Sequence, residues 1–163
     1  MDNNFVRDCL WGTMYAEKVT NALIVMGWKA CTLPSLNNMG GDVIAISPKG
    51  IRHLIEVKAN RGCNLSGEHY DTFILETFRD MVKQSPSLWR IEPITMLVIC
   101  DASTDMAHVY NARKLQQSVQ VLIDQGTQQV KSGNGIGTAG GHSWGYKIPW
   151  QDKSFGWITS VSI

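Results

Sequence analysis

Residues 41–58 read GDVIAISPKGIRHLIEVK and form the most informative stretch of the chain. Two apolar segments flank the sequence Ser47-Pro48-Lys49-Gly50. Proline after serine suits the first half of a type I turn, and glycine suits the position after it. The stretch therefore predicts a β-hairpin with strands over about 42–46 and 51–58.

The turn also predicts how the two strands align. If Gly50 adopts a left-handed conformation, the loop has three residues and a bulge, and the numbers of paired residues add to 98. Asp42 then lies opposite Glu56. Side chains alternate between the two faces of a strand, so Lys58 shares the face of Glu56. A two-residue loop would instead separate the two carboxylates onto opposite faces. The glycine favours the first register.

Asp42, Glu56 and Lys58 together indicate a specific chemistry. Two carboxylates can hold a hard divalent cation through oxygen, and a lysine beside them can orient a water molecule or stabilise developing negative charge. This combination is suited to the cleavage of phosphodiesters.

The same residues make the chain resemble the PD-(D/E)XK nuclease superfamily, the restriction-endonuclease-like fold. The signature is an Asp at the start of one strand and (Asp/Glu)-x-Lys near the end of the next, matched here by Asp42, Glu56 and Lys58. Gly41 stands where many members have proline. The resemblance implies a DNA nuclease that uses Mg²⁺ or Mn²⁺, held by Asp42, Glu56 and the backbone carbonyl of Val57. It also implies products with a 5′-phosphate and a homodimer that cuts two strands with two sites.

A helix is predicted from about residue 4 to residue 26, with an apolar stripe that includes Ala16, Val19 and Leu23. Glu17 lies beside this stripe. In some relatives of the resembled family, a glutamate of the first helix joins the metal site, so the resemblance makes Glu17 a fourth catalytic candidate. The alternative is a glutamate at the rim of the core with a solvated carboxylate.

Further elements follow the hairpin in an order typical of the resembled fold. We expect a helix over 71–84, a buried strand over 94–100, a short strand over 107–110 and a helix over 111–125. The resulting class is α/β: a restriction-endonuclease-like mixed β-sheet of about five strands flanked by helices. The resemblance covers about residues 4–125.

The segment 126–163 does not follow from this pattern. It begins with a glycine-rich stretch that lacks the Gly-Lys-Ser/Thr of a phosphate-binding loop, and aromatic residues follow it. Alternating aromatics could stack on bases. The favoured interpretation is a final hairpin that covers the sheet edge, or a dimer contact. We treat residues 1–163 as one domain with 126–163 as its glycine- and aromatic-rich extension.

Composition sets further bounds. The chain has 163 residues, 44% of them hydrophobic, and a formal net charge of +1, less basic than many nucleic-acid-binding domains. A local patch is enough for DNA binding, and Arg61, His69 and Lys83 are the candidates. His69 follows the active-site strand, whereas His53 and His108 read as structural. Without an apolar run long enough to span a membrane, or a signal-peptide pattern at the N-terminus, we expect a cytoplasmic protein with buried thiols at Cys9 and Cys100.

Three functions remain open from the sequence. The first is a DNA endonuclease, either junction-resolving or site-specific like small phage or homing enzymes; a single-site exonuclease or nicking enzyme is a variant of it. The second is a non-catalytic DNA-binding or interaction protein that retains the fold. The third is a structural or interaction protein in which an ion pair between Glu56 and Lys58 explains the motif.

Overall fold

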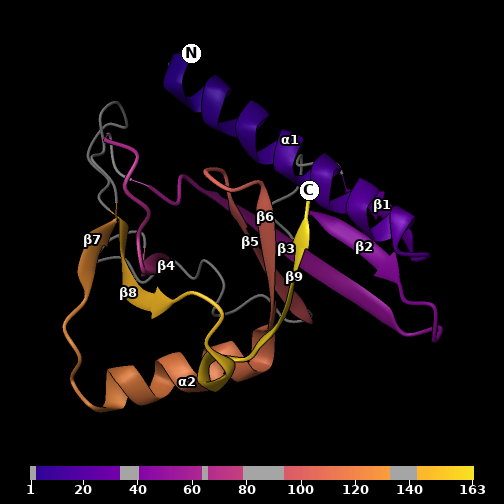
Figure 1. Ribbon diagram of the computed structural model, residues 1–163. Coiled ribbons are helices and arrows are strands. Elements are labelled where there is room, and N and C mark those ends of the chain that lie inside the picture. Colours follow the sequence, from indigo (N-terminus) through magenta and orange to yellow (C-terminus); the bar gives the residue numbers. More distant parts are fainter. Residues whose placement is uncertain (1–2, 34–40, 64–65, 79–93, 133–142) are drawn as a thin grey trace.

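The structure is a computed structural model that describes residues 3–33, 41–63, 66–78, 94–132 and 143–163 (Figure 1). In these ranges the chain forms a mixed α/β fold. Its elements are α1 (Asn3–Val25), β1 (Lys29–Thr32), β2 (Val43–Ile46), β3 (Arg52–Asn60), β4 (Thr72–Phe78), β5 (Met96–Asp101), β6 (Met106–Asn111), α2 (Ala112–Asp124), β7 (Val130–Ser132), β8 (Ser143–Pro149), the short 3-10 helix η1 (Lys153–Phe155) and β9 (Trp157–Ser162).

The strands form two sheets. The main sheet has six strands in the order β1-β2-β3-β5-β6-β9, and the second has three in the order β4-β8-β7. In the main sheet β3 and β5 run parallel and every other neighbouring pair is antiparallel. The predicted α/β class with a mixed sheet and flanking helices is therefore confirmed.

Helix α1 forms as the apolar periodicity predicts. Tyr15, Ala16, Val19 and Thr20 are buried against the sheet. The helix ends where Gly27 takes a φ of +83°, with its amide bonded to the carbonyl of Ile24 and the next amide bonded to that of Leu23. This pattern is the glycine-terminated helix end that the sequence Met26-Gly27 allows. No helix in the described ranges is long and apolar enough to cross a membrane.

The hairpin has the register that the turn predicts. Val43 pairs with Ile55 and Ile46 with Arg52, and the residue numbers of each pair add to 98. Gly50 has a φ of +79°, and the amides of Ser47 and Gly50 close the three-residue loop by bonding to the carbonyls of Ile51 and Ser47. The left-handed glycine, which any β-branched residue would resist, therefore fixes which side chains face one another.

The elements predicted around 94–125 also form. The apolar run becomes the buried strand β5, β6 returns antiparallel to it, and α2 follows directly. Asn111 caps α2 by accepting a hydrogen bond from the amide of Lys114 through its side chain. Leu115 and Val119 are buried, as their helical spacing predicts.

The predicted helix over 71–84 is wrong where the structure describes it. Residues 72–78 form strand β4, which pairs antiparallel with β8. Ile74, Leu75 and Phe78 suggested a helical face, but Phe73 and Leu75 are the buried pair, two positions apart as in a strand. Short apolar runs fit both periods, and pairing with a distant strand decided the outcome. Residues 79–84 lie outside the described ranges.

Each face of the main sheet is covered by a different layer. Helix α1 packs with Val43, Ala45, Ile55 and Val57 in one core. The opposite face contributes Leu97, Ile99 and Tyr110 to a second core, which contains residues from α2, β4 and β8. Figure 1 shows α1 on one side of the sheet, with α2 and the second sheet on the other.

The segment after residue 126 is part of these layers. Strand β8 is the central strand of the second sheet, and β9 extends the main sheet beside β6. They belong to different sheets and do not form one final hairpin. Tyr146 is buried, and Trp150, Phe155 and Trp157 pack against the second core. Tyr146 therefore does not serve as a base-stacking platform. The glycine-rich residues 133–141 lie outside the described ranges.

Candidate active site on one face of the main sheet

Asp42, Glu56 and Lys58 lie together on the face opposite α1. Alternation along β3 puts Val57 in the core beneath α1 and directs Glu56 and Lys58 to the other face. The amide of Asp42 donates to the carbonyl of Ile55 at 2.8 Å, and its carboxylate accepts a 2.8 Å hydrogen bond from the amide of Val57. The hairpin register therefore places the Asp42 carboxylate beside β3 at the level of Glu56.

The charges of Asp42, Glu56 and Lys58 do not balance one another. Burial, followed by the nearby Glu56 carboxylate, raises the pKa of Asp42, against the lowering effects of the Val57 amide and Lys58. Lys58 Nζ lies 2.5 Å from Glu56 Oε1, and the Glu56 side chain is only 12% exposed. Among the described residues, two partly buried carboxylates share one ammonium group here, so additional positive charge would be favourable.

A divalent cation fits this donor set. Asp42 and Glu56 offer carboxylate oxygens, and the resemblance adds the carbonyl of Val57. In the described ranges no group of three His, Cys, Asp or Glu side chains is arranged to hold a metal ion. A cation bound by two carboxylates would therefore keep several water ligands, which suits Mg²⁺.

The fold does not place Glu17 beside Asp42, Glu56 and Lys58. It is an exposed residue of α1, and α1 packs on the opposite face of the sheet from Glu56 and Lys58. Ala16 and Thr20 occupy the buried face of the helix in its place. This position is the one expected for a glutamate at the rim of the core with a solvated carboxylate.

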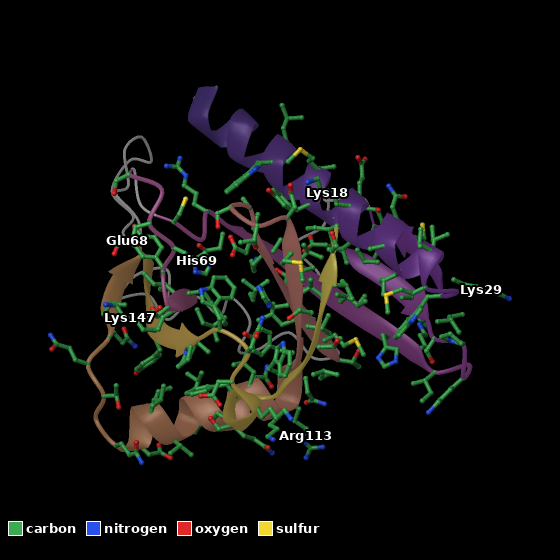
Figure 2. The ribbon with its side chains drawn as sticks, in the orientation of Figure 1. Lys18, Lys29, Glu68, His69, Arg113 and Lys147 are labelled. Carbon is green, nitrogen blue, oxygen red and sulfur yellow. The ribbon has the colours of Figure 1, made fainter. Side chains whose placement is uncertain are left out.

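Of the candidates for DNA contact, Arg61 and His69 lie in the loop between β3 and β4, and Lys83 lies outside the described ranges. Arg61 is exposed, and the His69 side chain is 45% exposed. Figure 2 shows His69 close to Glu68, on the far side of the main sheet from Lys18 of α1. His69 is thus on the same side of the sheet as Glu56 and Lys58.

Sequence reasoning missed Asp101, the partner of His69. Asp101 ends β5 and is only 1% exposed. It pairs with Asn60 at the end of the parallel strand β3, and its Oδ2 lies 2.6 Å from Nε2 of His69. The available signal was an acidic residue directly after a continuous apolar strand, followed by Ser103 and Thr104. Ligand sites of open α/β sheets lie at such carboxyl ends of strands.

His53, His108 and Cys100 have surroundings typical of structural residues. His108 is buried, bonds to Ser160 Oγ at 2.8 Å and stacks near Trp150. His53 lies against Trp28 at the opposite end of β3. Burial lowers the pKa of both histidines and raises the pKa of Cys100 to about 12, so that the Cys100 thiol stays protonated. The side chain of Cys9 lies outside the described part.

No protein-family model, curated protein or solved structure matches this chain.

Proposed function

We propose that the protein is a Mg²⁺-dependent DNA endonuclease of restriction-endonuclease-like fold, and that Asp42, Glu56 and Lys58 form its active site. The observation that carries the proposal is the hairpin register. It brings an aspartate, a glutamate and a lysine to one sheet face, in the arrangement that the family signature requires.

Each residue has a role that its surroundings support. Asp42 and Glu56, with the carbonyl of Val57, would hold Mg²⁺ or Mn²⁺, which supplies Lewis-acid stabilisation of a phosphodiester when bound. The Lys58 ammonium contacts Glu56, and its side chain is 50% exposed, so that a water molecule or a phosphate oxygen can approach it. The Val57 amide fixes the orientation of the Asp42 carboxylate. Glu17 has no part in this mechanism.

The proposed substrate is duplex or branched DNA, and the proposed assembly is a homodimer. One metal site per chain cuts one strand, so that a symmetric cut in a duplex or a junction requires two chains.

A second function is favoured by one specific observation. The 2.5 Å contact between Lys58 and Glu56 is an ion pair that needs no metal and no substrate. In a non-catalytic DNA-binding or interaction protein of this fold, that pair would only stabilise the hairpin face.

A cleavage assay separates the two functions. Linear, nicked, branched and supercoiled DNA are incubated with the protein and Mg²⁺ or Mn²⁺, and metal binding is followed by calorimetry. We expect wild-type cleavage, no cleavage by Glu56→Gln or Lys58→Ala, and unchanged circular dichroism. Glu17→Gln is the matched control because it removes an exposed helical carboxylate, and it should cut normally. Full activity of Glu56→Gln, or no metal-dependent cleavage of any substrate, rejects the nuclease.

A further inference from the structure

The second polar cluster on this sheet face consists of His69, Asp101, Ser103 and Thr104. It lies at the carboxyl ends of the two parallel strands, where Asn60 of β3 pairs with Asp101 of β5. The backbone joins the two strand ends as well, because the amide of Ala102 donates to the carbonyl of Asn60 at 2.8 Å. The cluster thus lies where the ends of β3 and β5 are joined, and it continues the row of Glu56 and Lys58 on the same face.

Asp101 is held by several donors at once. Its Oδ1 accepts from the amide and the hydroxyl of Ser103, at 2.9 and 2.6 Å, and its Oδ2 accepts from Thr104 Oγ1 at 2.9 Å. His69 adds the fourth contact. Burial acts to raise the pKa of Asp101, but the hydrogen bonds from Ser103, His69 and Thr104 together lower it. The carboxylate is therefore ionised at neutral pH.

His69 is oriented by this carboxylate and remains accessible. With Nε2 directed at Asp101, the ring presents Nδ1 away from it, and within the described part of the chain Nδ1 has no hydrogen-bond partner. The Trp150 ring, 6.1 Å from the imidazole, limits how the ring can turn. The loop is also fixed behind the histidine, because the amide of Tyr70 bonds to Gly62 and the indole of Trp150 bonds to the carbonyl of Tyr70.

Protonation of this histidine reverses what the pair offers to an anion. Neutral His69 beside ionised Asp101 carries a net charge of −1 and presents a lone pair at Nδ1, and both repel a phosphate. The protonated pair is neutral overall and presents an N–H donor at the same position.

Other ionisable groups surround the pair. His108 of β6 lies near the pair, and Glu68 and Tyr70 belong to the same loop as His69. Lys58 of β3 pairs with Ile99 of β5, which in turn pairs with His108. Lys58 therefore lies on the same sheet face as the pair, on the strand next to that of Asp101. Burial is the main influence that lowers the pKa of His108, against the raising effect of Asp101.

We propose that His69, positioned by Asp101, contacts a backbone phosphate of DNA next to the Lys58 site and makes DNA binding tighter as the pH falls. The inference rests on the proposed function for the identity of its ligand. It adds a pH-dependent substrate contact that the metal site does not supply.

The test measures binding of a short fluorescent DNA duplex in EDTA, so that no metal-dependent cleavage interferes. From about pH 8 to about pH 5.5 we expect wild-type affinity to rise roughly tenfold. The slope of log K against log salt should steepen by about 0.9, the value of one additional phosphate contact. A role for His69 in loop structure alone would not change that slope with pH.

Three variants locate the effect. His69→Gln keeps an amide donor for Asp101 and cannot become charged, so it should bind DNA with the same affinity and slope at both pH values. His53→Gln, at the opposite end of β3, should retain the full pH effect, and so should His108→Gln. A pH effect that survives in His69→Gln, or is lost in His53→Gln, overturns the inference.

The outcomes separate this inference from the proposed nuclease. Wild-type protein that cuts DNA with Mg²⁺ but binds it equally well at all pH values contradicts only the role of His69. Protein that shows His69-dependent, pH-dependent binding yet cuts no substrate contradicts only the nuclease. Protein that binds no DNA at any pH overturns the inference.

Discussion

Two carboxylates on one sheet face, Asp42 and Asp101, have opposite surroundings. Asp101 is almost fully buried and accepts hydrogen bonds from the Ser103 amide, two hydroxyls and His69, which lower its pKa. Asp42 accepts one backbone hydrogen bond and lies beside Glu56, and its pKa is raised. The Asp101 carboxylate therefore has its hydrogen-bond partners within the fold, whereas the Asp42 carboxylate would be stabilised by additional positive charge.

This difference indicates that Asp101 stabilises the fold and is in keeping with the proposal that Asp42 serves a ligand. A satisfied carboxylate contributes to stability, whereas two crowded carboxylates oppose folding until a cation binds. The same substitution, Asp→Asn, should thus have opposite effects at the two positions.

The largest effect is expected for Asp101→Asn. The amide group would face donors of Ser103, Thr104 and His69, and at least one would lose its acceptor in a buried site. The free energy of unfolding should fall by roughly 3–5 kcal/mol. Urea denaturation measures it.

Asp105→Asn is the matched control, because Asp105 lies in the same turn with a 62% exposed side chain and pairs only with Lys18 among the described residues. Its removal should cost less than about 1 kcal/mol. Equal losses for the two variants would show that Asp101 is not specially supported.

Gly62→Ala should produce the next largest loss. Gly62 has a φ of +70°, and a Cβ added there would lie 1.8 Å from Asp101 Oδ1. The substitution combines left-handed strain with displacement of the buried carboxylate, so that we expect a loss of about 2–4 kcal/mol. Thermal or urea unfolding reports it.

Gly67→Ala provides the comparison within the same loop. Gly67 has a φ of +85°, and no atom of the described residues lies within 4 Å of an added Cβ, so only the backbone strain applies. Its cost should be near 1 kcal/mol. If Gly62→Ala proves no worse than Gly67→Ala, the loop does not pack on Asp101 as described.

The hairpin could be predicted from sequence because its determinants are local. Gly50 and the turn around Pro48 fix the register of both strands, and the register fixes that Asp42 and Glu56 share a face. The helices follow for a similar reason, since periodicity and an end signal such as Gly27 or Asn111 lie within one segment.

The parts that could not be predicted depend on contacts between distant residues. Residues 72–78 are a strand because β8, far along the chain, supplies the partner. The pairing of His69 with Asp101 requires the parallel register of β3 and β5, which no local pattern encodes. Glu17 shows the converse case, because a resemblance suggested a role that the packing of α1 on the other sheet face does not support.

The pH dependence of the free energy of unfolding tests the surroundings of Asp101 and of the neighbouring His108. Burial lowers the pKa of His108 below its unfolded value, so stability is complete above about pH 6.5 and declines as the pH falls through the lower folded value. The pKa of Asp101 is also lowered, so its contribution is present above about pH 3.9 and is lost in stronger acid. Urea unfolding at a series of pH values should show both declines.

His108→Gln should remove much of the first decline and leave the second. His53 is shifted in the same direction and accounts for part of the remaining dependence between pH 7 and 5. Stability that rises as the pH falls through this window would mean that His108 is charged rather than buried as a neutral ring.

The smallest change in stability, and the opposite sign, is expected for Asp42→Asn. The amide oxygen can still accept the hydrogen bond from the Val57 amide, while the repulsion between Asp42 and Glu56 disappears. The metal-free protein should gain from a few tenths to about 1 kcal/mol in the free energy of unfolding. Mg²⁺ should raise the melting temperature of the wild type, because ligands that bind only the folded state stabilise it, and should leave that of Asp42→Asn unchanged. A variant that is less stable than the wild type without metal, and that still responds to Mg²⁺, would show that Asp42 is a structural carboxylate like Asp101. The contrast between the two aspartates, and with it the case for a metal site at Asp42, would then be lost.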